Sequence, residues 1–321
     1  MLKSDLKFAV RQVLRHPGYA LTVIVTLALG IGANTAIFSV INSVLLSNLP
    51  VRDPQQLVFL THPNEQGFES GFGDGDRDFV TYPEFQQLER NNQLFSGLLA
   101  ASSYTSRIPV EMQGGSTANG ALAQISLVSG SYFSVLGVTP SLGRAFGPEV
   151  DRARDANPVA VISDAFWRDR FGGAGDVAGR TVRIRNTSYE IVAVAPPQFH
   201  GETVGASPDI WVPLTMEAEI FPGHDYLSRE TNPFHKTEWL QVIGRLKPGV
   251  TLARAKAGVE VEFHQMMEAQ TAGMSAQDQQ RFLNQHLPVT AGNRGASTLR
   301  SDFGKPLLIL MVIVGLILLI A

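Results

Sequence analysis

The sequence contains no cysteine among its 321 residues. A disulfide scaffold, a thiol nucleophile, an iron–sulfur cluster and a zinc site built on cysteine are therefore excluded. Charged residues make up only 17% of the chain, and the formal net charge is −3. Such a balance gives no general attraction to nucleic acid, which requires a basic face. Hydrophobic residues reach 44%, which is too much apolar content for a chain that is mostly disordered.

Catalytic and nucleotide-binding motifs are also missing. The seven histidines are scattered along the chain, and none lies in an H-E-x-x-H or H-x-x-E-H pattern. The string Gly173–Ala178 fits G-x-G-x-x-A, and Ala174–Thr181 is close to a phosphate loop. Neither directly follows a predicted strand and opens a helix, as nucleotide binding requires. We expect a turn before a strand at this position, and we predict neither an enzyme nor a bound cofactor.

One acidic stretch is similar to the start of a calcium-binding loop. Asp74, Asp76 and Asp78 alternate as the first ligands of such a loop do. Phe79 then stands where the loop needs glycine, and Phe85 stands where it needs the bidentate glutamate. We therefore interpret the stretch as a solvated loop and predict no metal site.

Two long apolar runs lie near the ends of the sequence. Tyr19–Leu46 is free of charged residues and longer than the ~20 residues that cross a bilayer core. A cleavable signal peptide has a shorter apolar stretch, of about 7–15 residues, so we predict an uncleaved transmembrane helix over 18–46. A buried core helix is a weaker alternative at this length. The second run, Pro306–Ala321, is still apolar where the sequence ends. We expect a second, truncated transmembrane helix there, in a chain that is a fragment.

Basic residues precede the first run, against a single acid, Asp5. By the positive-inside rule the N-terminus is cytoplasmic, and residues 47–305 lie on the far side of the membrane. The basic residues recur at every fourth position and would form one stripe on a helix. We predict an amphipathic helix over 1–17 in the cytoplasmic interface, although charge that only sets the topology is an alternative. The four residues are Lys3, Lys7, Arg11 and Arg15.

Small residues recur within the first run. Ala28, Gly32 and Ala36 are four positions apart, a spacing that lets two helix backbones approach closely. They are a candidate packing face toward a partner helix. Ordinary use of small residues in lipid is an equally good interpretation of this common pattern.

The segment between the two runs alternates strand and helix patterns, which predicts a mixed α/β domain. Thr81 and Glu84 form a capping-box pattern that opens a helix to about Asn91. Ser163 or Asp164 caps a second helix that ends at a glycine pair, and Thr251 starts an amphipathic third. Strands are expected at 57–61, 97–104, 108–113, 121–127, 158–162, 181–184, 189–194 and 239–246, a helical turn at 131–136, and a polar connector at 269–295.

Several phrases of the sequence resemble the MacB/FtsX-like ABC transporter permeases. The similarity covers nearly the whole chain in the right order and is closest to the acidobacterial-type duplicated permease subgroup. Its N-terminal phrase is DLKFAVRQVLRHPGYALTVIVTLALGIGANTAIFSVINSVLL (5–46). The phrases that resemble the MacB-like periplasmic core domain are VSGSYFSVLGVTPSLGRAF (128–146), PVAVISDAFWRDRFGG (158–173), GRTVRIRNTSYEIVAVAPPQF (179–199) and DIWVPL (209–214). A third phrase, RLKPGVTLARAKAGVE (245–260), resembles the return segment of the family.

The resemblance implies a fold and partners. The fold is a membrane protein with an α+β extracytoplasmic domain of two subdomains, one flanking (about 50–127 and 238–288) and one inserted (about 128–237). The implied partners are a cytosolic ABC ATPase near the basic stripe, a second permease unit, membrane lipid and a periplasmic adaptor. Nucleic acid is not among them. The implied location is the inner membrane, with the main domain in the periplasm.

The function that follows from the resemblance is that of a permease subunit. ATP hydrolysis by a partner chain would be coupled to a periplasmic conformational change that drives export or extrusion, by mechanotransmission. An alternative from another class is an FtsX-like signalling scaffold that regulates a periplasmic hydrolase or senses antimicrobial peptides. A membrane-anchored enzyme is the weakest hypothesis, because no catalytic constellation is present.

Overall fold

The computed structural model describes residues 17–42, 47–71, 75–112, 121–228 and 236–320. These residues divide into two compact units. The first comprises residues 1–47 and 299–321, and the second, called the domain below, comprises residues 48–298. The predicted amphipathic helix over 1–17 lies almost entirely outside the described residues.

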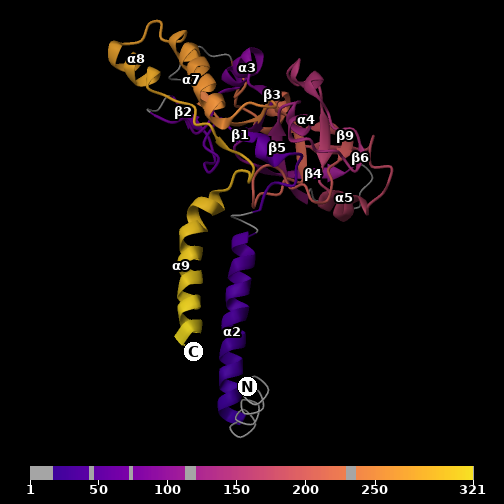
Figure 1. The fold of residues 1–321 in the computed structure, drawn as a ribbon. Helices are drawn as coiled ribbons and strands as arrows, with labels where there is room; N and C mark the ends of the chain where they lie inside the picture. The colour runs from indigo at the N-terminus through magenta and orange to yellow at the C-terminus, as the bar shows by residue number, and fades with distance from the viewer. Residues whose placement is uncertain (1–16, 43–46, 72–74, 113–120, 229–235, 321) are drawn as a thin grey trace. The chain divides into compact units, whose positions relative to one another are not determined.

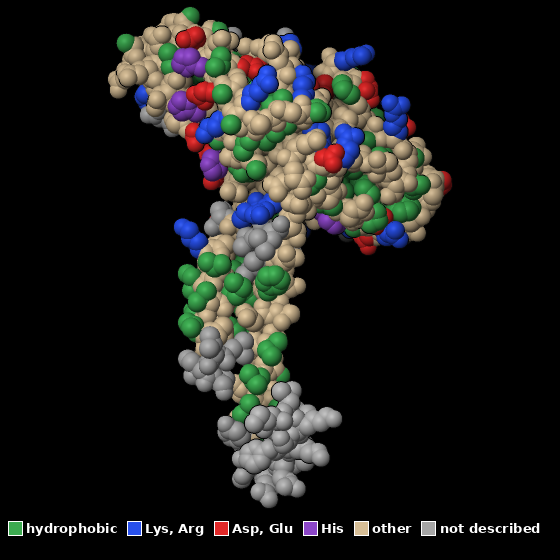
Figure 2. Space-filling view, in the orientation of Figure 1, with side chains coloured by type: hydrophobic (Ala, Val, Ile, Leu, Met, Phe, Trp, Pro, Cys, Tyr) green, Lys and Arg blue, Asp and Glu red, His purple; other side chains and the backbone are tan. Residues whose placement is uncertain are grey.

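The first unit contains the apolar helix α2 (Pro17–Ile41). Its stretch Ala20–Ser39 is the one helix among the described residues that is long and apolar enough to cross a membrane. Large side chains such as Leu21 and Leu29 are exposed on it, and Figure 2 shows hydrophobic side chains along its surface. The hydroxyl of Thr26 donates to the carbonyl of Thr22 at 2.8 Å, which satisfies a polar group within an apolar helix.

The C-terminal run of the first unit is also helical. Helix α9 spans Thr298–Ile320 and contains Pro306, so it begins earlier than the predicted run. Its role as a second membrane span stays a prediction. The predicted continuation of the first helix through residues 43–46 lies outside the described residues.

The domain is built on one large mixed sheet. The strand order is β10-β7-β9-β8-β4-β5-β3-β12-β1-β13, with β6 paired to β9, and β2 and β11 form a separate small sheet. The strands are β1 (Leu57–Phe59), β2 (Glu69–Ser70), β3 (Phe95–Ser102), β4 (Ser106–Met112), β5 (Ala121–Val128), β6 (Leu142–Gly143), β7 (Val159–Ile162), β8 (Thr181–Ile184), β9 (Thr187–Val194), β10 (Ile210–Pro213), β11 (Thr237–Glu238), β12 (Leu240–Leu246) and β13 (Thr290–Ala291).

Six of these strands close into a barrel. Strand β10 pairs antiparallel with β7 and also parallel with β5, where Ile210 lies opposite Ile125. The circuit β10-β7-β9-β8-β4-β5 therefore returns to its starting strand, which removes two exposed sheet edges. Strands β3, β12, β1 and β13 extend from the barrel through the pairing of β3 with β5. The predicted mixed α/β class is confirmed, whereas the division into flanking and inserted subdomains stays a prediction.

Helices cover the sheet extension and the barrel, and Figure 1 shows α7 and α8 beside one another at one end of the domain. The helices are α3 (Tyr82–Asn91), α4 (Tyr132–Leu136), α5 (Asp164–Phe171), α6 (Glu217–Ile220), α7 (Leu252–Glu268) and α8 (Ala276–Leu283), with short 3-10 turns at Pro54–Gln56, Pro148–Asp151 and Leu214–Met216.

The domain has a hydrophobic core on each face of its sheet. Along β1 and the residue after it, Val58 and Leu60 join one core, whereas Leu57 and Phe59 join the other. The first core also holds the inward-facing residues of the barrel and the buried side of α7. The second contains the aromatic residues of α4, where Phe133 meets Phe146 edge to face at 5.6 Å. Alternation along each strand produces this two-sided burial.

The predicted helix boundaries are confirmed where the sequence carries a capping signal. Thr81 and Glu84 form both hydrogen bonds of the capping box at the start of α3. Ser163 and Thr251 accept from the backbone at the starts of α5 and α7. Gly172 ends α5 in the left-handed conformation with φ 62°, which glycine adopts at little cost.

The predicted polar connector over 269–295 is wrong. This stretch contains α8 and β13, and it buries Phe282, Leu287 and Val289 in the first core, to which α3 and α7 also contribute. Its polar residues lie on the exposed side of α8, so the composition of the stretch hides an amphipathic helix.

A buried ion cluster ties this stretch to the rest of the domain. Arg77 contacts the carboxylates of Glu84 at 3.0 Å and Glu238 at 2.6 Å, and it donates to Gln285 at 3.1 Å. Burial alone would raise the pKa of Glu84, but Arg77 and the N–H of Thr81 hold it below its usual value. Burial raises the pKa of Glu238 to about 8. Arg77 opposes this shift, but the nearby carboxylates of Glu84 and Glu69 add to it.

Glu238→Gln is expected to flatten the pH dependence of stability. The folded domain keeps a proton on Glu238 that the unfolded chain releases above about pH 4.5. The stability linked to this proton is complete below pH 4.5 and is lost as the pH rises through about 8. Urea unfolding of the full chain in detergent, followed by tryptophan fluorescence from pH 5 to above 8, measures this slope. Glu69, which pairs with Glu238 across the small sheet, is kept in this variant. Glu268→Gln, an exposed substitution at the end of α7, is the control and should keep the wild-type slope. Equal slopes in wild type and Glu238→Gln would contradict the assignment.

Phe282→Ala is expected to lower the free energy of unfolding by about 3–5 kcal/mol, because it empties a buried site in α8. Chemical unfolding in detergent measures the change. Gln279→Ala, on the exposed side of the same helix, should change stability by less than about 0.5 kcal/mol. A negligible loss for Phe282→Ala would restore the view of this stretch as a loose connector.

Candidate functional site

The residues selected from the sequence lie in the first unit. Lys3, Lys7, Arg11 and Arg15 are outside the described residues, and their proposed role near an ATPase stays a prediction. Ala28, Gly32 and Ala36 lie on α2 and are exposed there. A Cβ atom added at Gly32 would meet nothing within 4 Å, so there is room for close approach by another helix. The packing face also stays a prediction.

The sequence stretches judged to be decoys have ordinary structural roles where they are described. Residues 173–178 form turns between α5 and β8, as predicted, and the indole of Trp167 donates to Ala174 O at 2.9 Å. Asp76 forms a β-bridge with His286, and Asp74 lies outside the described residues. Within the described ranges, no group of three or more His, Asp and Glu residues could hold a metal ion.

The first and last residues of the domain are hydrogen-bonded to one another. The N–H of Leu49 donates to Asn293 O at 2.9 Å, and the side-chain amide of Asn293 donates to Asn48 Oδ1 at 2.8 Å. The first residues of the domain are thus hydrogen-bonded to residues close to its last, Thr298. The chain that arrives after α2 and the chain that leaves toward α9 are joined at one point of the domain.

A second hydrogen-bonded contact holds the outgoing chain. Ala296 donates to Glu202 O at 2.9 Å, and Val204 donates back to Ala296 O at 2.8 Å. Gly295 has φ +70°, and a Cβ there would lie 2.3 Å from Glu202 O and 2.8 Å from a methyl carbon of Leu49. Glycine is therefore required at this position by both conformation and space.

Glu202 connects this contact to the second core. Its buried carboxylate accepts from the hydroxyl of Tyr132 on α4, and burial raises the pKa of that hydroxyl well above its usual value. The Tyr132 ring packs edge to face on Phe133, which in turn meets Trp211 of β10 at 6.1 Å. The outgoing chain is thereby linked to the strand that closes the barrel.

Arg245 holds the incoming chain from the other side. Its guanidinium donates to the carbonyls of Arg52 at 2.6 Å and Asp53 at 3.1 Å, and to Val135 O at 2.7 Å. Burial lowers the pKa of Arg245. One side chain of β12 thus fixes the chain after Leu49 and the end of α4 together. We call the three segments 48–53, 202–204 and 293–297, with Arg245, the junction.

Sequence reasoning missed the junction. Arg245 offers a signal, because it is a lone charge in the otherwise uncharged strand LQVIGRL. Asn293 and Gly295 lie in a stretch whose polar composition is typical of any loop. The junction consists of hydrogen bonds, most of them to backbone carbonyls, and of close contacts around Gly295.

One family model matches this sequence. The model of the MacB-like periplasmic core domain matches residues 20–261. Among solved structures, the periplasmic region of MacB from Actinobacillus actinomycetemcomitans is similar at 11% identity and TM-score 0.47, covering 74% of this chain and 90% of that one. The extracellular domain of the ABC-type transporter YknZ from Gram-positive bacteria is similar at 11% identity and TM-score 0.42, covering 63% and 94%.

No curated protein matches the sequence significantly. The family assignment rests on the family model, which covers most of α2 and most of the domain. The expected resemblance to the MacB-like core domain is confirmed, while the subgroup and the fragment stay predictions. The chain belongs to the MacB-like periplasmic core domain family, the periplasmic part of MacB-like ABC transporter permeases.

Proposed function

We propose that this chain is the part of an ABC permease subunit that converts ATP hydrolysis by a partner chain into movement of its periplasmic domain. The movement would drive export or extrusion. The family assignment supports an extracytoplasmic domain of a transporter. The candidate membrane helix Ala20–Ser39 precedes that domain in the chain and supports a membrane anchor.

The observation that carries the proposal is the hydrogen bonding of Asn48 and Leu49 to Asn293. A displacement of the chain at either end of the domain, at 48–53 or at 293–297, would reach both β1 and the segment 202–204. It would do so through the hydrogen bonds that the stretch 290–297 forms with them. Backbone hydrogen bonds and packed elements carry such displacements because their arrangements are discrete. The proposal places a cytosolic ATPase at Lys3, Lys7, Arg11 and Arg15, and it includes a second permease unit and the inner membrane.

A pull-down tests for the ATPase partner. The full-length gene product, tagged at its C-terminus, is captured in detergent from its native host and its companions are identified by mass spectrometry. We expect an ABC-type ATPase that is lost when the four basic residues are changed to Glu and kept when they are changed to the other basic residue, Arg or Lys. A periplasmic hydrolase or a sensor protein recovered without any ATPase would overturn the proposal in favour of the signalling scaffold.

Gly295→Ala is expected to uncouple ATP hydrolysis from periplasmic movement. The added methyl group would collide with Glu202 O and Leu49, which separates the outgoing chain from its partners. In liposomes that contain the captured complex, the ATPase rate should persist while ATP-dependent change in a fluorophore on the domain falls at least threefold.

Gly273→Ala is the matched control for this experiment. Gly273 has φ +85°, similar to Gly295, but a Cβ there would meet nothing within 4 Å. Both variants therefore carry a similar backbone strain, and only Gly295→Ala breaks a close contact. Equal losses in the two variants would show that the junction does not transmit the movement.

A further inference from the structure

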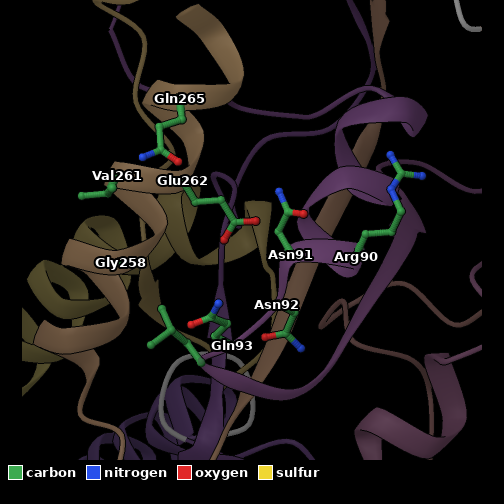
Figure 3. Close-up of a pocket in the computed structure, with 9 residues that line it drawn as sticks. Arg90, Asn91, Asn92, Gln93, Gly258, Val261, Glu262 and Gln265 are labelled. Atoms are coloured by element: carbon green, nitrogen blue, oxygen red, sulfur yellow. The ribbon is translucent and has the colours of Figure 1, made fainter. Parts of the chain in front are cut away.

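A groove between α3 and α7 lies away from the junction. It has a volume of about 630 Å³, within the range typical of small-molecule sites. One wall is the end of α3 and the segment after it, and the other is one side of α7 (Figure 3). The polar residues that line it are Arg90, Asn91, Asn92, Gln93, Glu262 and Gln265.

Glu262 lines this groove and has one unsatisfied carboxylate oxygen. Its Oε1 atom is buried and has no hydrogen-bond partner among the described residues. Burial raises the pKa of Glu262. Figure 3 shows the side chain reaching toward Asn91, while the guanidinium of Arg90 is directed away from it. A buried acceptor without a donor is destabilising, and a ligand that supplies a donor would remove this cost.

The other polar side chains of the groove are also available. Asn91, Gln93 and Gln265 also line the groove, and all three residues are exposed. Each carboxamide offers both donors and acceptors. A ligand that only donates, such as a polyamine, would leave their N–H groups unmatched.

The walls of the groove are held in place. The Asn92 side chain exchanges two hydrogen bonds with the backbone of Phe95, at 2.8 and 3.0 Å, and Lys247 donates to Gln93 O at 2.8 Å. A Cβ at Gly258 would lie 2.4 Å from a methyl carbon of Leu94, so the glycine lets this segment approach α7 closely. A site that is ordered before binding loses less entropy when a ligand enters.

We propose that the groove binds a small molecule with a primary ammonium group flanked by amides or hydroxyls. The ammonium donates to Glu262, and the flanking groups pair with the carboxamides of Asn91, Gln93 and Gln265. The amino end of a short peptide and an amino sugar both carry this chemistry. The inference is independent of the proposed function, because it requires neither an ATPase nor a movement of the domain.

Binding to the full chain in detergent tests the proposal with two probe pairs. Triglycinamide is compared with N-acetyl-triglycinamide, and glucosamine with N-acetylglucosamine, by saturation-transfer NMR and calorimetry. N-acetylation removes the ammonium group and keeps the rest of each probe. We expect at least one ammonium probe to bind at least tenfold more tightly than its acetylated form. The pair that shows this difference identifies the source of the ammonium.

Two variants of α7 locate the binding. Glu262→Gln should weaken binding of the ammonium probe at least tenfold, and it removes a buried charge, so it should not impair folding. Glu268→Gln, on the same helix with an exposed side chain, should leave the affinity unchanged. In the wild type, affinity should rise with pH as Glu262 loses its proton. Failure of both ammonium probes to bind, equal binding of the acetylated forms, or unchanged affinity in Glu262→Gln would each overturn the proposal.

Discussion

The stretch 290–297 is the piece of backbone on which the two ends of the domain depend. It adds β13 to the edge of β1, and Gly292 donates to Leu57 O at 2.8 Å. It then accepts from Leu49 and pairs with Glu202 before α9 begins. These bonds join segments far apart in the sequence, so they form only when the sheet is complete. The entry and exit of the chain are therefore held by the same stretch that pairs with the edge of the sheet.

Two buried arginines stabilise this arrangement in different ways. Arg77 is neutralised by carboxylates, and the surplus carboxylate of Glu238 makes the cluster sensitive to pH. Arg245 donates to backbone carbonyls, whose acceptor strength does not change with pH. The charge of the Arg77 cluster, which attaches the stretch around α8, therefore changes with pH. The hydrogen bonds of Arg245 to the incoming chain do not. Both roles depend on desolvation, since exposed pairs of this kind contribute little.

The sequence predicts the local part of this structure well and the non-local part poorly. The starts of α3, α5 and α7 are set by one side chain that satisfies a nearby backbone N–H, so Thr81, Ser163 and Thr251 mark them. Strand β10 is four residues long, and its pairing with both β5 and β7 closes the barrel across more than 80 residues of chain. Periodicity over so short a segment does not determine a strand. Helix α8 is also short, and its sequence is mostly polar, so it was not predicted. The junction was not predicted because its contacts join segments that are far apart in the sequence.

The junction leaves no motif in the sequence because it consists mainly of backbone hydrogen bonds. A catalytic site needs particular side chains at particular spacings, and these leave a pattern in the sequence. A mechanical contact needs hydrogen bonds that any residue except proline can donate, together with space at one or two positions. Gly295 is required because Glu202 O and Leu49 leave no room for a side chain, and Asn293 because its amide reaches Asn48. The junction becomes visible only when the register of the sheet is known, so the structure rather than a sequence pattern identifies it.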